Sequence, residues 1–257
     1  MSLRIGIAGI TGRMGRLLAE EIPAAGAVLS GGTSRDPAAI APAGTTLFGD
    51  LGALADASDV VVDFTHAATA CAHAAILSRH AAAWVLGSSG LSSADEAAVA
   101  AAAQAIPVVY AANFSPGVNL VLALAERMAA ALPGDQYDAE IVEMHHRQKV
   151  DAPSGTAIGI GRAVASGRGV ALDAVMESGR HGHTGPRRTG AIGFAALRGG
   201  QVVGEHTLLF AAATEQIALT HRAFDRRAFA SGAVRAAIWA AGRKAGRYDM
   251  ADVLGMR

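Results

Sequence analysis

The densest group of polar side chains in the chain lies at residues 143–156, which read EMHHRQKVDAPSGT. Its histidines, His145 and His146, end an apolar stretch that predicts a strand. Arg147 and Lys149 follow closely, and this concentration of positive charge and N–H donors would attract an anion. A histidine also delivers a proton near neutral pH, so the segment predicts acid catalysis on an anionic small molecule.

A second anion-binding element follows in the same segment. Ser154, Gly155 and Thr156 stand where a helix is expected to begin, and backbone N–H groups there, with two hydroxyls, would hold an anion. Two anion-binding elements so close together suit a small dicarboxylate. Because neighbouring residues of a strand point to opposite faces, His145 and His146 cannot share one role. One would give the proton, and the other would contact the substrate or support the wall of the site.

Metal binding is a poor alternative for this segment. The chain has one cysteine, Cys71, and no third ligand with the usual spacing lies near the two histidines. His181 and His183 stand in a glycine-rich stretch that predicts a loop. We therefore expect no metal site.

A glycine loop near the N-terminus predicts a dinucleotide site. Gly9, Gly12 and Gly15 separate an apolar run at residues 4–8 from a segment with helical spacing that starts at Arg16. In a strand–turn–helix unit, such glycines let backbone N–H groups approach a pyrophosphate at the helix start. The spacing differs from the commoner G-x-G-x-x-G, and a plain glycine turn is the alternative reading.

The end of the second predicted strand indicates which dinucleotide is preferred. Sites that prefer NAD usually place an acid there for the ribose hydroxyls, whereas this chain has Ser34 and Arg35. Arg35 would pair with a 2′-phosphate, which favours NADPH; the alternative is a solvated loop arginine. Two further loops, at residues 87–90 and 111–114, also follow predicted strands and would flank the nicotinamide end.

The elements that must position these residues form two groups. Strands expected at 4–8, 27–32, 59–64, 82–86 and 106–111 alternate with helices, which predicts a parallel sheet covered on both faces. After Asn113 a helix is expected at 118–132, then strands at 139–146, 191–198, 201–210 and 215–220. Gly199-Gly200 predicts a hairpin between two of these strands. A last helix is expected from Asp225 to about Gly246.

Composition excludes several classes of protein. Of the 257 residues, 51% are hydrophobic and 17% charged, which excludes a disordered chain. Lys+Arg and Asp+Glu both number 22, which argues against a dedicated nucleic-acid or membrane-surface binder. No apolar run reaches the roughly 18 residues that span a bilayer, and the N-terminus lacks the order of a secretion signal. We expect a soluble, cytoplasmic protein.

These motifs together resemble the dihydrodipicolinate reductase family, over nearly the whole chain. The most specific is the run from His145 to Thr156, HHRQKVDAPSGT. The resemblance continues through GITGRMG at 9–15, DFT at 63–65, GSSG at 87–90, AANFSPG at 111–117, GHTG at 182–185 and GEH at 204–206.

The resemblance implies roles for individual residues. His145 matches the proton donor, and Lys149 matches the lysine that assists catalysis and binds a substrate carboxylate. The substrate would bind at His146, Lys149, Ser154, Gly155 and Thr156. The cofactor would bind at Gly9, Ile10, Thr11, Gly12, Arg13, Met14, Ser34, Arg35, Gly87, Ser88, Ser89, Ala111, Ala112, Asn113 and Phe114.

The resemblance also implies a fold and a reaction. We expect a Rossmann-type dinucleotide-binding domain at 1–113 and 224–257, and an α+β domain at 114–223 with a mixed, mostly antiparallel sheet for substrate binding and assembly of a homotetramer. The reaction would be NADPH-dependent hydride transfer to 4-hydroxy-tetrahydrodipicolinate, a cyclic dicarboxylate, in lysine and diaminopimelate biosynthesis. Ser34 replaces an acid found in members that use both cofactors, so NADH is expected to work less well. Another NADP-dependent reductase and a non-catalytic dinucleotide sensor are the alternatives.

Overall fold

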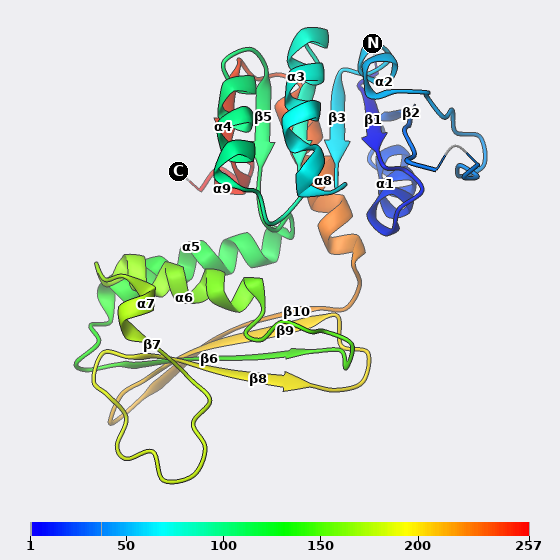
Figure 1. Ribbon diagram of the computed structural model, residues 1–257. Coiled ribbons are helices and arrows are strands. Elements are labelled where there is room, and N and C mark those ends of the chain that lie inside the picture. Colours follow the sequence, from blue (N-terminus) through cyan, green and yellow to red (C-terminus); the bar gives the residue numbers. More distant parts are fainter. Residues whose placement is uncertain (1, 37, 257) are drawn as a thin grey trace. The chain divides into compact units, whose positions relative to one another are not determined.

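The computed structural model describes residues 2–36 and 38–256 and divides the chain into two compact units (Figure 1). Unit 1 comprises residues 1–116 and 227–257, and unit 2 comprises residues 117–226. Unit 2 is therefore an insertion in the sequence of unit 1.

Unit 1 is built on a parallel sheet with the strand order β11-β5-β4-β3-β1-β2. Parallel strands buried on both faces are apolar throughout, and residues 60–62, all valine, are buried accordingly. The strands are β1 (Arg4–Ala8), β2 (Val28–Gly32), β3 (Val60–Asp63), β4 (Ala83–Leu86), β5 (Pro107–Tyr110) and β11 (Gly246–Tyr248).

Helices cover both faces of this sheet, as the alternating pattern predicted. One face packs against α1 (Arg13–Ala24), α8 (Arg227–Ala240) and α9 (Met250–Leu254). The other packs against α2 (Leu51–Asp56), α3 (Ala70–His80), which follows the 3₁₀ turn η1 (Ala67–Thr69), and α4 (Ser93–Ala102). The single last helix expected from the sequence is wrong: α8 ends at Ala240, and β11 and α9 follow it.

Unit 2 contains a mixed sheet, which confirms the expected class. The strand order is β10-β9-β6-β8-β7; the ladders of β6 with β9 and of β9 with β10 are antiparallel, and those of β6 with β8 and of β8 with β7 are parallel. The strands are β6 (Asp138–His145), β7 (Met176–Ser178), β8 (Ile192–Arg198), β9 (Gly204–Ala211) and β10 (Gln216–Ala223). Three helices, α5 (Pro116–Ala131), α6 (Gly155–Gly167) and α7 (Leu172–Val175), contribute to the core on one face.

The hairpin expected at Gly199-Gly200 is wrong. β8 and β9 lie on either side of β6, so the connection between them passes around the end of β6. The Gly199 N–H donates to the His145 carbonyl at 3.0 Å, and the His146 N–H donates to the Val202 carbonyl at 2.7 Å. The end of β6 is thereby held from both sides, where the predicted catalytic segment begins.

Close packing of α8 gives a stability prediction. A Cβ atom on Gly232 would lie 1.8 Å from the Phe114 carbonyl oxygen, which is backbone and cannot rotate away. We expect Gly232→Ala to lower the free energy of unfolding by about 1–3 kcal/mol, despite alanine's better helix propensity. Gly242→Ala is the matched control, because nothing lies within 4 Å of a Cβ there. Equal urea midpoints for the two variants would contradict the packing argument.

Candidate functional site

The predicted cofactor residues of unit 1 gather at one edge of its sheet. The loops at 9–14, 34–35, 87–89 and 111–114 follow β1, β2, β4 and β5, and parallel strands end at a common edge. β1 lies between β2 and β3, so the direction in which the strands are added reverses there. Dinucleotides bind at such a switch point in open α/β sheets.

The glycine loop has the close packing that a pyrophosphate cradle needs. A Cβ on Gly15 would lie 2.3 Å from the Gly9 carbonyl oxygen, so only glycine lets α1 approach the loop this closely. Gly12 caps α1 without a side-chain hydrogen bond. Thr11 Oγ1 lies 3.0 Å from Ser34 Oγ, which ties this loop to the segment after β2. The loop fits a dinucleotide phosphate at the helix start.

Two other side chains at this edge fit a ligand. Ser88 is buried, and its Oγ has no hydrogen-bond partner among the described residues, which is unusual for a buried hydroxyl. Arg35 is exposed and forms no ion pair within residues 2–36 and 38–256. A bound dinucleotide would supply an acceptor for the first and a phosphate for the second.

Some of the predicted cofactor residues do not present their side chains to a ligand. The side chains of Ile10 and Phe114 are buried in the core of unit 1, and the Phe114 ring packs edge-on against Phe64 at 5.4 Å between centroids. Asn113 Oδ1 accepts the Ser115 N–H at 2.8 Å and shapes the turn after β5. Ile10 and Phe114 would therefore support the loops from within, and only their backbone is available to a ligand.

Unit 2 has one cluster of polar side chains on the helix-covered face of its sheet. Alternation along β6 puts Glu143 and His145 on the same face. Arg198 of β8 pairs with His145 in the parallel ladder, and His206 of β9 pairs with Glu143 in the antiparallel one. Three strands thus bring these four side chains together.

Glu143 is the centre of this cluster. Its Oε2 lies 2.6 Å from His145 Nδ1, and Arg198 donates to Oε2 at 2.9 Å and to Oε1 at 2.8 Å. The Ser154 N–H also donates to Oε1, at 3.1 Å. Burial by itself would raise the pKa of Glu143, but the hydrogen bonds from Arg198 and His145 outweigh it and hold that pKa below its usual value.

The protonation of His145 depends on opposing influences. Burial lowers the pKa of His145, the Glu143 carboxylate opposes this, and the positive charges of Lys149 and Arg198 lower the pKa further. The pKa of His145 is below its usual value as a result. Its ring meets that of His206 edge-on at 5.1 Å between centroids, and burial lowers the pKa of His206 to about 4. His206 is therefore neutral at pH 7.

Ser154 supports the site from inside the protein. Its Oγ accepts the Ala157 N–H at 3.2 Å, which caps α6, and lies 3.0 Å from His206 Nε2. The residue is 2% exposed, so its hydroxyl is not available to a substrate as the sequence suggested. Gly155 is exposed and Thr156 half-buried at the start of the helix.

Lys149 and His146 lie beyond the end of β6. Lys149 Nζ is 2.8 Å from both carboxylate oxygens of Asp151, which leaves one of its three N–H donors for another acceptor. His146 Nδ1 is buried without a hydrogen-bond partner in the described part of the chain. The two neighbouring histidines thus have different surroundings, but alternation along a strand is not the reason, because β6 ends at His145 and not at His146 as expected.

Sequence reasoning missed three members of this cluster, Glu143, Arg198 and His206. His206 stands in the motif GEH at 204–206, which carried the resemblance but was given no role in the site. Glu143 lies two residues before His145, and strand periodicity alone placed both on one face, so the signal was present. Nothing near Arg198 in the sequence indicated that β8 would lie beside β6, because the hairpin prediction paired β8 with β9.

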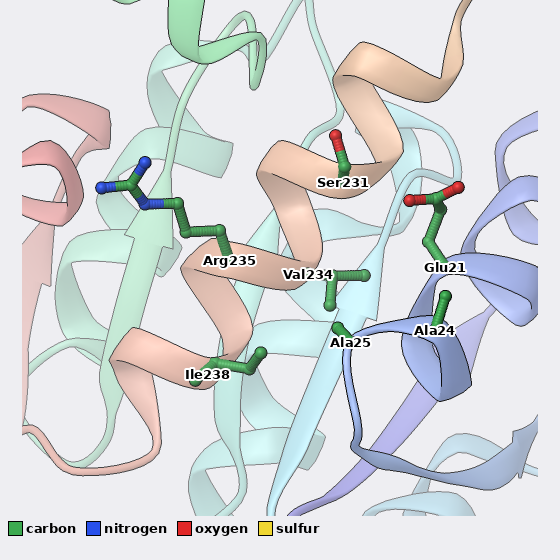
Figure 2. A pocket seen from close by; sticks show the side chains of 7 residues that line it. All are labelled: Glu21, Ala24, Ala25, Ser231, Val234, Arg235 and Ile238. Atoms are coloured by element: carbon green, nitrogen blue, oxygen red, sulfur yellow. The ribbon is translucent and has the colours of Figure 1, made fainter.

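One pocket of the structure lies away from the predicted site. A pocket of about 270 Å³ between α1 and α8 is lined by none of the predicted residues (Figure 2).

Within the described residues, no three His, Cys, Asp or Glu side chains are grouped so that they would hold a metal ion. None of the described helices combines the length and apolar character that crossing a membrane requires.

Comparisons with known proteins agree with this architecture. The chain is 69% identical to the 4-hydroxy-tetrahydrodipicolinate reductase of Granulibacter bethesdensis over 257 residues, which cover 100% of this chain and 98% of that protein. It is 66% identical to the protein of the same name from Gluconacetobacter diazotrophicus, with 99% and 98% covered. A solved structure, the dipicolinate-bound dihydrodipicolinate reductase of Paenisporosarcina sp. TG-14, has the same fold at a TM-score of 0.78 and 22% identity, with 97% and 98% covered.

Family models match both parts of the chain. The model described as the N-terminus of dihydrodipicolinate reductase matches residues 3–114, and the model described as its C-terminus matches residues 117–254. The resemblance noted in the sequence is confirmed, and with it the expectation of an oxidoreductase with a Rossmann-type unit. The chain belongs to the dihydrodipicolinate reductase family.

Proposed function

We propose that this chain reduces 4-hydroxy-tetrahydrodipicolinate to tetrahydrodipicolinate with NADPH, in lysine and diaminopimelate biosynthesis. The observation that carries the proposal is the buried His145–Glu143 pair, at 2.6 Å, next to the start of α6 and to Lys149. It supplies a proton donor among cationic groups, which is what reduction of an anionic cyclic imine requires. The names of the full-length relatives indicate the substrate.

We assign the two activities of a reductase to the two domains expected from the sequence. Residues 1–113 and 224–257 bind the dinucleotide, and residues 114–223 bind the substrate and other copies of the chain. The support in unit 1 is the glycine loop, the unpartnered Ser88 hydroxyl and the exposed Arg35. The support in unit 2 is the polar cluster around Glu143.

The residues of unit 2 divide the chemical work. NADPH, when bound, supplies the hydride that adds to the ring of the substrate. His145 gives a proton from Nε2, so that one hydride and one proton are added, and the 4-hydroxyl group of the substrate leaves as water. Lys149, His146 and the N–H groups at Gly155 and Thr156 bind the two carboxylates, and the free N–H of Lys149 points to direct binding of one of them.

Cofactor choice is assigned to the segment after β2. Ser34 accepts the Asp36 N–H at 3.2 Å and lies beside Thr11, so no carboxylate stands at the position that receives ribose hydroxyls in NAD sites. Arg35 is the group that would pair with the 2′-phosphate of NADPH. We propose that NADPH is preferred and NADH is used less well.

The first test measures NADPH oxidation by absorbance, with the substrate generated from pyruvate and aspartate semialdehyde by the upstream synthase. Rapid oxidation that needs the synthase is expected. Arg35→Ala should then raise the KM for NADPH by about tenfold, the loss of one charge-assisted hydrogen bond, and leave the KM for NADH within about twofold. NADPH binding without turnover would instead favour a dinucleotide sensor, and turnover of another substrate only would favour a different reductase.

Substitutions of the two catalytic candidates separate proton donation from binding. His145→Gln should lower kcat by about 10²–10⁴-fold with a modest change in KM, whereas Lys149→Ala should impair both. In the native protein, kcat/KM should fall as pH rises through the pKa of His145, because only the protonated ring donates. Because burial lowers the pKa of His145, this decrease in kcat/KM should occur below about pH 6.5 in the free enzyme.

His80→Gln, at the end of α3, is the control for these substitutions and should leave both constants unchanged. A near-normal kcat for His145→Gln would exclude the acid role.

The uncovered face of the unit 2 sheet supports a homotetramer. Val142 and Met144 alternate with the buried residues of β6, and Leu197 of β8, paired with Met144, is 51% exposed. Leu209 of β9 lies on the same face. We propose that other copies of this chain cover this face, since apolar side chains exposed together, with polar residues such as Glu205 and Thr207 beside them, are typical of a protein interface.

Sedimentation velocity should give the mass of four chains. Leu197→Glu should produce smaller species, because it places a charge in the apolar contact. Leu120→Glu is the matched control, since Leu120 is 49% exposed on α5, over the other face. A native protein that sediments as a monomer would contradict the proposal.

We also place the reaction in the cytoplasm, where a biosynthetic reductase meets the pool of reduced dinucleotide. Recovery of the chain in the soluble fraction of cells that produce it is the expected result, and recovery in an exported fraction would exclude this location.

A further inference from the structure

We propose that Glu143 is a positioning residue for the reaction, which fixes the ring of His145 so that Nε2 alone exchanges a proton with the substrate. The inference rests on the proposed function, because it assigns a partner to the proton donor of that reaction. Glu143 does not touch the substrate in this proposal, and it acts through His145.

The first support is the number of donors around one buried carboxylate. Glu143 is 1% exposed, and its two oxygens receive hydrogen bonds from His145, from both terminal nitrogens of Arg198 and from the Ser154 N–H. A buried carboxylate with this many donors, one of them a cation, remains ionised. Both oxygens are held from β8 and from the start of α6, so the carboxylate has no freedom to follow a moving ring.

The second support is the hydrogen on His145 Nδ1. An ionised carboxylate only accepts hydrogen bonds, so the nitrogen 2.6 Å from Glu143 Oε2 must carry the hydrogen. The neutral ring is therefore the Nδ1–H form, and the proton that comes and goes is on Nε2. Nε2 lies beside Gly204, where even a Cβ atom would be 3.1 Å away, so the absence of a side chain keeps the space next to it open.

The third support is the balance of charge around the ring. Lys149 from the loop after β6 and Arg198 from β8 both disfavour the protonated form, and His206 from β9, in edge-on contact, is neutral. Of the groups around the ring, Glu143 is the one that favours the protonated form of His145. Without its charge, the pKa of His145 would be lower still, and the ring would be protonated over a narrower range of pH.

Glu143→Gln removes the charge and retains the shape. We expect kcat to fall by at least about tenfold, with the KM values for substrate and NADPH within about threefold. The alkaline limb of the kcat profile should move to lower pH by about one unit, because an opposite charge no longer supports the imidazolium. A fall in kcat with an unmoved limb would overturn the proposal, since it would indicate a merely structural role.

Glu140→Gln is the matched control. Glu140 lies on the same strand but on the opposite face, and it also forms ion pairs with arginines, at 2.9 Å to Arg180 and 2.8 Å to Arg187. Its loss should leave the alkaline limb in place. The double variant Glu143→Gln/His145→Gln should turn over no more slowly than His145→Gln alone, because Glu143 acts through that ring. Multiplied losses would overturn the proposal.

A spectroscopic measurement on the unaltered protein keeps the test independent of folding and of turnover. In ¹⁵N-histidine spectra of the full chain, with His145→Gln to assign the signal, the neutral His145 ring should carry its hydrogen on Nδ1. A neutral Nε2–H ring would overturn the inference. A chain that fails to reduce the substrate would overturn the proposed function only, and the ring's tautomer would still decide the role of Glu143.

Discussion

The hydrogen bonds between Arg198 and Glu143 join the parts of unit 2 that the site needs. A carboxylate with 1% exposure is costly to bury alone, and its partners make the burial tolerable. For Arg198 to reach Glu143, β8 must lie beside β6, which fixes the sheet order. Arg198 also donates to the Asp151 carbonyl at 2.8 Å, so the same guanidinium holds the loop that carries Lys149.

The start of α6 depends on the same carboxylate. The Ser154 N–H donates to Glu143, while the Ser154 hydroxyl caps the helix through the Ala157 N–H and contacts His206. The proton donor and the segment that would receive an anion are thus fixed to one buried group. Rigid support of this kind is what precise placement of a reacting molecule demands.

The parts of the fold that follow from neighbouring residues were predictable, and those that depend on distant strands were not. The strand–glycine loop–helix order at residues 4–24 and the alternation up to residue 111 gave the doubly wound sheet of unit 1, because each βαβ step is local. Gly199-Gly200 looked like a hairpin because the local signal says nothing of a third strand. In the structure β6 lies between β8 and β9, and this order brings Arg198 of β8 next to the site.

The roles of single residues were likewise predictable only where neighbouring residues carry the signal. The type and spacing of His145 and Lys149 indicated the chemical segment, and the glycine loop indicated the cofactor edge. The burial of Ser154, Ile10 and Phe114 could not be predicted, since it depends on α6 packing over the sheet in one unit and on the core in the other. Sequence patterns found the chemical segments, whereas the structure separates side chains that face a ligand from those that support them.

The insertion of unit 2 into the sequence of unit 1 has a consequence for the order of folding during synthesis. Unit 2 is continuous, so all its strands are available once the ribosome has made residue 226. The core of unit 1, by contrast, needs residues of α8 and α9, among them Ala233, Val234 and Met250, which emerge after unit 2 although β1 emerges first. Until then, of the three helices α1, α8 and α9, only α1 can cover their face of the parallel sheet, and chaperones would meet a chain in which unit 2 is complete and unit 1 is not.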